Sequence, residues 1–288
     1  MSLDLNSSKK YRQLKLQDGK LISLDAPKVM GILNMTPDSF FAGSRYLGNS
    51  QKTIDIVGDM LTSGATFIDI GGYSTRPKAS VISIEEEKER VLPVIELIHS
   101  HFPDAIISID TFRSSVAREA IKAGAGMIND IAGGNLDEEM FQTVAELEVP
   151  YVLMHSRGNP ETMTQLNEYK DITIDVIAEL QQKVFQLRKL GVKDIIIDPG
   201  FGFAKNPKQG FEMMRNLSAF QIMELPLLVG ISRKSMIWRT LGITANEALN
   251  GTTALNMVAL MHGASILRVH DVKEAVQTIR LYDELVDV

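Results

Sequence analysis

The feature that most constrains the fold of this chain is a regular alternation between short apolar runs and longer amphipathic stretches. Apolar runs with the length of a buried strand cover residues 29–34, 67–72, 106–110, 126–130, 151–155, 194–198, 227–232 and 266–270. Continuous apolar runs of this kind are typical of strands that are covered on both faces, as in a parallel sheet. The pattern therefore indicates an α/β protein.

Stretches with helical periodicity lie between these strands and after the last one. They cover residues 52–64, 85–100, 114–124, 137–147, 171–191, 207–220, 246–263 and 271–285. Eight strands alternating with eight helices in 288 residues predict a closed (β/α)8 barrel, or TIM barrel, as a single domain over residues 1–288. Residues 1–28 are expected to form a short N-terminal hairpin that caps the barrel. An open doubly wound sheet stays possible, although no GxGxxG motif follows the first strand.

Composition excludes several classes of protein. The chain is 44% hydrophobic and 23% charged, as expected for a globular domain. It has no cysteine, which excludes disulfides, zinc–thiolate sites and a cysteine nucleophile, and no signal-peptide pattern, so we expect a cytoplasmic protein. The net charge of −6 argues against nucleic acid as a partner, and no apolar run approaches the roughly 20 residues that span a membrane. Small molecules are the expected partners.

Polar residues stand at the C-terminal ends of the predicted strands, where the chemistry of such barrels gathers. They are Asn34, Thr75, Arg76, Asp110, Asn129, Asp130, His155, Asp198, Ser232, Arg233, Lys234, Arg268 and His270. We expect them to converge on one rim, with acidic and amide groups on one side and cations on the other. The first group suits a flat heterocycle that carries several N–H donors, and the second suits an anionic group.

Several of these residues also have a purely structural interpretation. Asp110 precedes a helical segment and could cap it. His155 could be a hydrogen-bonded interior histidine, Lys234 a solvated loop cation and Arg268 part of a surface salt bridge. Asp198 precedes Pro-Gly instead of a helix, so capping explains it poorly.

Several motifs together resemble those of the dihydropteroate synthase family, within the pterin-binding barrel superfamily. They are GILNMTPDSF, GGYSTRP, SIDTFRSSVAREAIKAGAGMINDIAGG, DPGFGFAKN, VGISRKSM, NGTTALNMVAL and RVHDV. The resemblance covers residues 29 to 285. It implies a Mg²⁺-dependent transferase of folate biosynthesis, which joins 4-aminobenzoate to 6-hydroxymethyl-7,8-dihydropterin pyrophosphate and releases 7,8-dihydropteroate and pyrophosphate. It also implies that the chain is a sulfonamide target, because these drugs mimic aminobenzoate.

The resemblance implies a role for individual residues as well. Pterin-binding residues would be Asp110, Asn129, Met154, Asp198 and Lys234. Aminobenzoate-binding residues would be Thr75, Pro77, Phe203, Ser232 and Lys234. Pyrophosphate-binding residues would be Asn34, Arg76, Arg268 and His270, and Asn34 would also contact Mg²⁺. The catalytic residues would be Asp110, Lys234, Arg268 and His270.

Two loops depart from the pattern that the family commonly shows. Residues 41–44 read Phe-Ala-Gly-Ser where the family commonly has Ser-Asp-Gly-Gly. In the second loop, Tyr73 replaces a frequent glutamate and Lys78 replaces a common glycine. We therefore expect the pocket to be retained and the way in which these loops close over it to differ.

Other functions remain open on the sequence alone. A methyltetrahydrofolate-binding methyltransferase would share the Asp-Asn-Asp pocket but would not need the anion-binding residues Arg268 and His270. A Schiff-base aldolase would use Lys234 as its nucleophile. A metallohydrolase would need paired histidines near the first strand, which are missing there, and a pterin-binding module without turnover also stays possible. The apolar surface of the last two predicted helices leads us to expect a homodimer.

Overall fold

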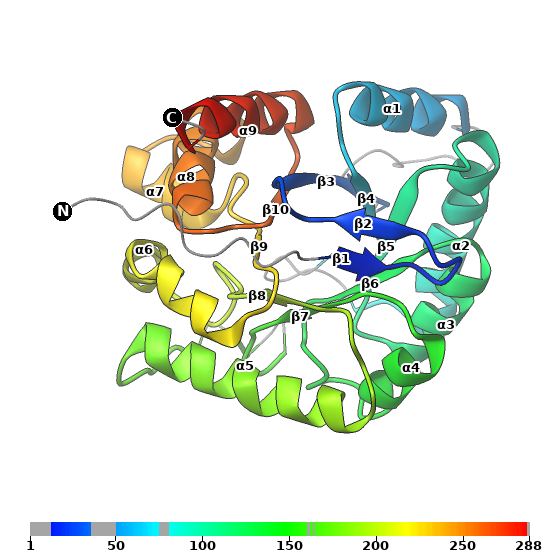
Figure 1. Cartoon of the computed structure of the whole chain (residues 1–288), viewed down its shortest axis with the longest axis horizontal. Helices are drawn as coiled ribbons and strands as arrows, with labels where there is room; N and C mark the ends of the chain where they lie inside the picture. The colour runs from blue at the N-terminus through cyan, green and yellow to red at the C-terminus, as the bar shows by residue number, and fades with distance from the viewer. Residues whose placement is uncertain (1–12, 36–49, 75–80, 160–161, 164, 287–288) are drawn as a thin grey trace.

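A closed barrel of parallel strands forms the centre of the molecule (Figure 1). The computed structural model describes residues 13–35, 50–74, 81–159, 162–163 and 165–286. The barrel strands are β3 (Lys28–Asn34), β4 (Phe67–Gly71), β5 (Ile106–Asp110), β6 (Met127–Asp130), β7 (Tyr151–Met154), β8 (Ile195–Asp198), β9 (Leu228–Val229) and β10 (Ile266–Val269). Their order is β8-β7-β6-β5-β4-β3-β10-β9. A parallel bridge between Ile197 and Leu227 joins the two outer strands of this order, so the predicted (β/α)8 barrel is confirmed.

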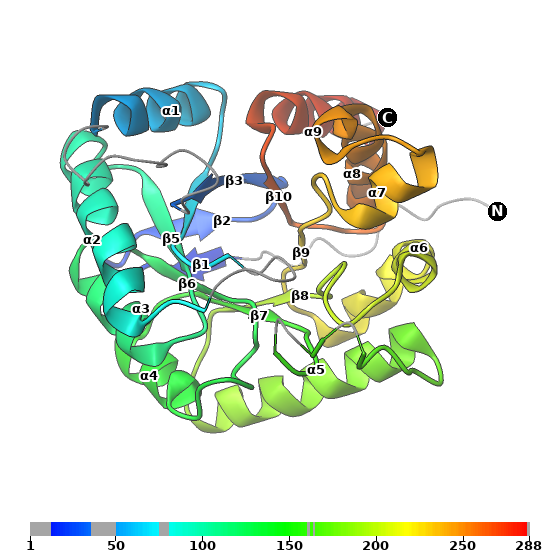
Figure 2. The same ribbon diagram turned by 180° about the vertical axis from the view of Figure 1, so that it is seen from behind.

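Helices surround the barrel on its outside, as both views show (Figures 1 and 2). They are α1 (Ser50–Thr62), α2 (Ile84–His101), α3 (Ser114–Lys122), α4 (Met140–Leu147), α5 (Ile172–Lys189), α6 (Pro207–Arg215), α7 (Ser235–Leu241), α8 (Leu249–Met261) and α9 (Val272–Val286). Two short 3-10 helices, η2 (Leu217–Met223) and η3 (Ala245–Glu247), precede β9 and α8. The described helices are too short or too polar for any of them to cross a lipid bilayer.

Two features of the helical layer differ from the prediction. Helix α7 was not predicted, because seven residues are too few for a clear apolar period. The segment 207–220 was expected to be one helix, but α6 ends at Arg215 and a 3-10 helix begins at Leu217. Helix α6 begins sharply, since Asn206 and Gln209 form a reciprocal capping box and Pro207 occupies the first turn.

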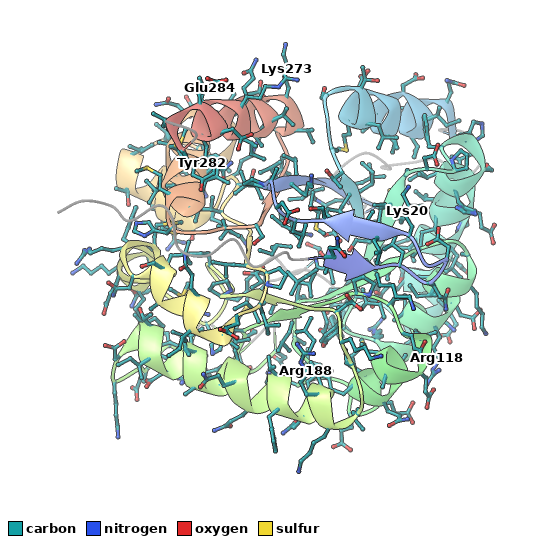
Figure 3. All side chains as sticks on the ribbon, viewed as in Figure 1. Lys20, Arg118, Arg188, Lys273, Tyr282 and Glu284 are labelled. Carbon is teal, nitrogen blue, oxygen red and sulfur yellow. The ribbon has the colours of Figure 1, made fainter. Side chains whose placement is uncertain are left out.

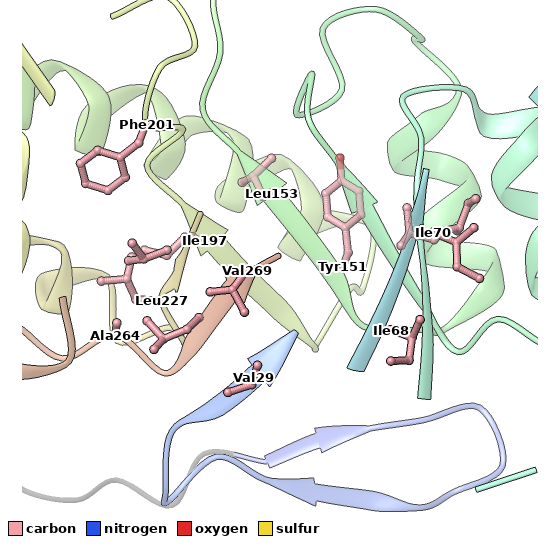
Figure 4. Packing of buried hydrophobic residues seen from close by; sticks show 14 of the residues in the cluster. Val29, Ile68, Ile70, Tyr151, Leu153, Ile197, Phe201, Leu227, Ala264 and Val269 are labelled. Carbon is pink, nitrogen blue, oxygen red and sulfur yellow. The ribbon is translucent and has the colours of Figure 1, made fainter. Parts of the chain in front are cut away.

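The core has two layers because successive side chains of a strand point to opposite faces. The outward-facing side chains pack against the helices, and Val29, Ile68, Leu153 and Ile197 are examples (Figure 4). The inward-facing side chains fill the N-terminal half of the barrel. They are Met30, Phe67, Ile106, Met127, Val152, Ile196, Leu228 and Ile266.

An antiparallel hairpin of β1 (Gln13–Lys15) and β2 (Leu21–Ser23) covers the N-terminal end of the barrel. Its side chains Leu14, Leu16, Ile22 and Leu24 belong to the same apolar cluster as the inner layer. The barrel is therefore sealed at this end, and polar chemistry is confined to the opposite end. Charged side chains such as Lys20, Arg188 and Lys273 point away from the core into solvent (Figure 3).

Candidate active site

A buried cluster of charged and amide groups lies directly above the apolar layer inside the barrel. Arg268 on β10 is its centre: Nε donates to Asp69 Oδ2 at 2.6 Å, and Nη2 donates to Asp110 Oδ2 at 2.5 Å. Asn129 on β6 donates its Nδ2 to the same Asp69 Oδ2 at 2.9 Å. Three neighbouring strands and β10 thus contribute to one network in the middle of the barrel, which we call the Arg268 cluster (Asp69, Asp110, Asn129 and Arg268).

The low polarity around the Arg268 cluster changes its protonation. Burial raises the pKa of Asp110 to about 7, with Arg268 opposing the shift and the charges of Asp69 and Glu87 adding to it. Burial lowers the pKa of Arg268, but Asp69 and Asp110 raise it more, so this guanidinium stays charged. Asp69 Oδ1 is buried and has no hydrogen-bond partner among the described residues. Negative charge therefore exceeds positive charge in the cluster when Asp110 is ionised.

Asp198, Phe203 and Lys234 form the neighbouring wall, at the ends of β8 and β9. The Oδ1 atom of Asp198 accepts from the Gly200 N–H at 2.8 Å, and burial raises the pKa of this carboxyl group against the effects of Gly200 and Lys234. Lys234 Nζ lies 4.3 Å from the centroid of the Phe203 ring, within the range of a cation–π contact. Burial and the charge of Arg268 lower the pKa of Lys234 to about 8.

Ser232 and His270 meet at the rim beyond Arg268. Ser232 Oγ lies 3.0 Å from His270 Nδ1 and accepts from the His270 backbone N–H at 3.2 Å. Desolvation by the surrounding protein and the neighbouring Arg268 and Arg233 lower the pKa of His270 to about 4.

Two other candidates, Asn34 and Met154, also lie at the C-terminal end of the barrel. Asn34 ends β3 and pairs in register with Gly71, which pairs with Asp110 on the next strand. Met154 ends β7, is buried, and pairs in register with Asp198. Both positions are next to residues of the site already described.

The separation of acidic and cationic groups that we expected is wrong. Arg268 lies between Asp69 and Asp110 instead of on an opposite side of the rim. Arg233 forms an ion pair with Asp271, with an Nη2–Oδ1 distance of 2.5 Å. A carboxylate is a strong partner for a guanidinium in a desolvated barrel, so the opposite charges pair instead of separating.

The structural interpretations of single residues can now be judged. Asp110 does not cap α3, since that helix begins at Ser114 after Arg113, which makes no side-chain cap. Arg268 is inside the barrel and not part of a surface salt bridge. His155 and Asp130 face outward from the barrel: His155 Nε2 lies 3.0 Å from Glu179 Oε2, and Asp130 accepts from the Tyr151 hydroxyl at 2.7 Å. For His155 the structural interpretation holds, and Asp130, which was expected at the rim, does not join the Arg268 cluster.

Part of the predicted site lies outside the described residues. Thr75, Arg76 and Pro77 fall there, as do residues 36–49 and Lys78 of the two divergent loops. Tyr73 is described, and its ring meets that of Phe112 edge to face at a centroid distance of 5.1 Å. Arg113 lies over the same ring at 5.4 Å, so Tyr73 is held at the base of the second loop.

Two residues close to the site were not predicted. Asp69 stands in the middle of β4, and we considered polar residues at strand ends. The sequence did contain a sign of its role. Asp69 is the charged residue of an otherwise apolar strand, and residues 67, 69 and 71 of that strand point to the same face. Lys205 was also missed, since a lysine in a glycine-rich loop gives no sequence sign of burial, yet it is 9% exposed.

A closed (β/α)8 barrel with a buried cluster of charged and amide groups at the C-terminal end of its strands is the arrangement of an enzyme barrel. A family described as "Pterin binding enzyme" matches residues 30–270, and the chain belongs to this family. The dihydropteroate synthase of Escherichia coli strain K12 is 42% identical over 271 residues, which are 92% of this chain and 94% of that protein. The corresponding protein of Synechocystis is 43% identical over 261 residues, 89% of each chain.

Solved structures agree with these sequence relatives. The Yersinia pestis dihydropteroate synthase in complex with a sulfonamide drug superimposes with a TM-score of 0.89 at 38% identity, covering 96% of this chain and 100% of that chain. The Xanthomonas albilineans enzyme in complex with 7,8-dihydropteroate has a TM-score of 0.85 at 32% identity, with 96% and 100% coverage. The resemblance to the dihydropteroate synthases is therefore confirmed, and the chain is a transferase of this kind.

Proposed function

We propose that the open end of the barrel joins 6-hydroxymethyl-7,8-dihydropterin pyrophosphate to 4-aminobenzoate, giving 7,8-dihydropteroate and pyrophosphate in folate biosynthesis. The observation that carries the proposal is the Arg268 cluster beside Asp198 and Lys234, because it combines acceptors for a heterocycle with cations for its anionic group. The dihydropteroate synthases that are 38–43% identical over most of the chain support it.

Asp110, Asn129, Asp198, Met154 and Lys234 are the proposed pterin-binding residues. A pterin presents adjacent N–H donors, and a carboxylate satisfies two of them with paired hydrogen bonds. Asp198 suits this role because the Gly200 N–H holds its carboxylate in place through Oδ1, and each carboxylate oxygen can still accept a further hydrogen bond. Asn129 adds an amide and Met154 adds an apolar surface to the pocket.

Arg268 and His270 are the proposed pyrophosphate-binding residues, together with Asn34 and Arg76. Arg268 uses Nε and one Nη2 hydrogen for Asp69 and Asp110, which leaves further N–H groups for a phosphate oxygen. Burial and the neighbouring Arg268 and Arg233 lower the pKa of His270, and a bound polyanion would raise it and favour the imidazolium ion.

Mg²⁺ is the proposed cofactor. No cluster of three histidine or carboxylate groups suited to a metal occurs in the described part of the chain. This fits Mg²⁺, because the ion commonly takes one or two protein ligands and fills its other positions with water and substrate phosphate. The amide oxygen of Asn34 would be the protein ligand, and the ion would neutralise charge on the leaving pyrophosphate.

Phe203, Ser232 and Lys234 are the proposed aminobenzoate-binding residues, with Thr75 and Pro77. The Phe203 ring offers an apolar surface to the aromatic ring, and Lys234 offers a cation for the carboxylate. With a pKa of about 8, Lys234 is mostly charged at neutral pH. A sulfonamide would occupy the same place because these drugs mimic aminobenzoate, and the Yersinia pestis relative forms a complex with such a drug.

The proposed reaction begins with the departure of pyrophosphate. Its C–O bond breaks with both electrons on oxygen, and the resulting cation at the pterin methylene is delocalised into the ring. The ionised carboxylates Asp110 and Asp198 stabilise this cation, and Arg268 stabilises the leaving charge. The neutral amine then forms the C–N bond and loses a proton. If the reaction follows this order, electron-withdrawing groups near the methylene of the pterin substrate would slow it. A rate that is insensitive to such groups would favour direct displacement.

The test is an assay of the purified protein with both substrates and Mg²⁺, following pyrophosphate and dihydropteroate together. We expect equal amounts of the two products. Asp198→Asn and Lys234→Met should each lower kcat/KM by about 100-fold, as for other electrostatic groups in active sites. Lys208→Met, on the exposed start of α6, should leave it unchanged. Pterin binding without pyrophosphate release would instead identify a binding module.

We also propose a cytoplasmic homodimer. The cysteine-free sequence fits a reducing compartment. The exposed apolar side chains of Met261, Leu281 and Leu285 on α8 and α9 would be covered by a second copy. Sedimentation at micromolar concentration should give twice the monomer mass, and a monomer at all concentrations would contradict the assembly.

A further inference from the structure

We propose that Lys205 is a positioning residue, which holds the loop between β8 and α6 in the conformation that presents Phe203 to the substrate. The inference rests on the function proposed above. The ammonium group of Lys205 contacts backbone carbonyls of its own loop, including that of Phe203, and the ring of His155 beyond the end of β7.

The contacts of Lys205 span the whole loop. Nζ donates to the carbonyl of Gly200 at 3.1 Å and to that of Phe203 at 3.0 Å. It also lies 2.8 Å from His155 Nδ1 and 3.5 Å from the His155 carbonyl. A single buried cation thereby joins both halves of the loop to the end of β7. Charge-assisted bonds of this kind are stronger than bonds between neutral groups.

The histidine contact continues to the outer helical layer. Burial and the charge of Lys205 lower the pKa of His155 to about 4, so its ring is neutral. A neutral ring that accepts from Lys205 at Nδ1 must carry its proton at Nε2, which then donates to Glu179 Oε2 on α5. Glu179 also accepts from Arg157. Lys205 is therefore anchored to a carboxylate on a long helix through one imidazole ring.

The loop needs this support because its backbone is held in unusual conformations. Gly200, Gly202 and Ala204 all have positive φ, of 70°, 79° and 51°. For Ala204, which has a Cβ atom, this conformation is unfavourable. A second side chain helps, since the Tyr169 hydroxyl donates to the Ala204 carbonyl at 3.0 Å. Without these donors, three carbonyl groups of the loop would lose their side-chain partners.

Lys205 also makes the loop sensitive to pH. Burial lowers the pKa of Lys205 to about 7, although the carboxylates Asp198 and Glu179 oppose the shift. The charged or titratable groups that face it are His155 at the end of β7, Arg157 after it, Tyr169 before α5, Glu179 on α5, Asp198 on β8 and Lys234 after β9. A neutral amine has one N–H fewer to donate, so the loop should loosen above neutral pH.

The experiment compares Lys205→Met with the wild type and with Lys208→Met, an exposed lysine three residues along the chain. Amide hydrogen exchange of residues 200–204 is followed by mass spectrometry, and steady-state kinetics are measured with each substrate varied. For Lys205→Met we expect exchange in this loop to be about 10-fold faster and the KM for aminobenzoate about 10-fold higher. The KM for the pterin substrate should change less, because β8 holds Asp198 through its own backbone pairing.

The outcomes separate this inference from the proposed function. Exchange and KM values equal to those of Lys208→Met would overturn the role of Lys205. Faster exchange in a protein whose wild type lacks turnover would support the loop anchor while refuting the synthase activity. If Lys205→Met does not fold, Lys205→Gln takes its place, because it keeps an N–H donor without the charge. Lys205→Gln should also show faster exchange in the loop and a higher KM for aminobenzoate, both to a smaller extent. If neither changes in Lys205→Gln, the inference is overturned as well.

Discussion

Asp69 shows how one side chain can organise a site without being at its entrance. It is fully buried in β4. Its carboxylate accepts hydrogen bonds from Arg268 on β10 and from Asn129 on β6, which lie in opposite directions around the barrel. Its charge also contributes to the raised pKa of Asp110. Asp69 therefore fixes the direction of a guanidinium and an amide and influences the protonation of a neighbouring carboxyl group.

Replacing Asp69 tests this role. In Asp69→Asn the shape is kept, but the charged acceptor for Arg268 is lost, so we expect kcat/KM to fall by about 10-fold to 100-fold, as for a lost charge-assisted hydrogen bond. The pKa of Asp110 should fall at the same time, because a negative neighbour has gone. NMR of labelled aspartate carboxyl carbons would measure it, and an unchanged pKa would show that Asp69 does not act on Asp110.

Protonation of Asp110 should make kcat/KM fall on the acidic side of its pH profile, starting near neutral pH. With a pKa of about 7, the carboxylate is protonated below that pH and can no longer stabilise positive charge on the substrate. We expect kcat/KM to fall tenfold per pH unit below about 7, and the limb should move to lower pH in Asp69→Asn. A flat profile from pH 5 to 8 would contradict an essential ionised Asp110.

The free energy of unfolding should fall as pH rises through this range, whereas kcat/KM should rise. The folded-state pKa of Asp110 is raised from 3.8, so the folded protein binds a proton that the unfolded chain has released. The contribution of this group to the free energy of unfolding is therefore present below pH 4 and is lost as pH rises to about 7. Urea unfolding at pH 5 and pH 8 measures it, and Asp110→Asn should remove this part of the pH dependence.

At the scale of the element, the turn after β8 depends on two glycines for different reasons. Both have positive φ, but a Cβ on Gly200 would lie 2.0 Å from the His155 carbonyl oxygen, while a Cβ on Gly202 would meet Lys234 Cδ at 3.5 Å. Backbone atoms leave no room for a side chain at residue 200, whereas residue 202 has room for one. The glycines of this loop therefore shape more than a turn, since Gly200 also allows the loop to pack against β7.

Alanine substitutions distinguish the two positions. Gly202→Ala should cost about 1 kcal/mol of stability, the usual cost of a side chain in the left-handed region. Gly200→Ala adds a backbone clash, so it should cost at least 3 kcal/mol more and reduce kcat/KM by shifting Asp198. Chemical denaturation together with the pyrophosphate assay would measure both, and equal effects at the two positions would argue against the close contact with β7.

At the scale of the whole molecule, stability and chemistry are placed at opposite ends of the barrel. The hairpin and the inner apolar layer form one cluster at the N-terminal end, and the Arg268 cluster lies above it. This division follows from burial, because the sealed end excludes water and the open end admits substrates. Changes at one end should therefore leave the other largely unaffected.

Leu14 provides the test, since it is 1% exposed within the hairpin cap. Leu14→Ala should lower the free energy of unfolding by about 3 kcal/mol. Truncation of a buried leucine to alanine usually costs about 2–5 kcal/mol. The KM values for both substrates should stay within about twofold of the wild type at a temperature where the variant is folded. A large rise in KM would show that the hairpin communicates with the site.

The sequence by itself determined the strand and helix pattern, and with it the barrel. A strand such as Ile195–Asp198 is apolar up to its last residue, and its length and apolar run can be read from the local sequence. The candidate residues Asp110, Asn129, Asp198, Lys234, Arg268 and His270 were found in the same way, because parallel strands end at the same edge of the sheet. The motifs also sufficed to predict the family.

Tertiary structure alone decided which of these groups meet. Arg268 and Asp69 are 199 residues apart in the chain, and no local pattern indicates that they form an ion pair. The lowered pKa of His270, the outward turn of His155 and the burial of Lys205 depend likewise on neighbours supplied by other strands and helices. Local propensity fixes the elements over a few residues, whereas desolvation and charge pairing act across the barrel and exist only once it has closed.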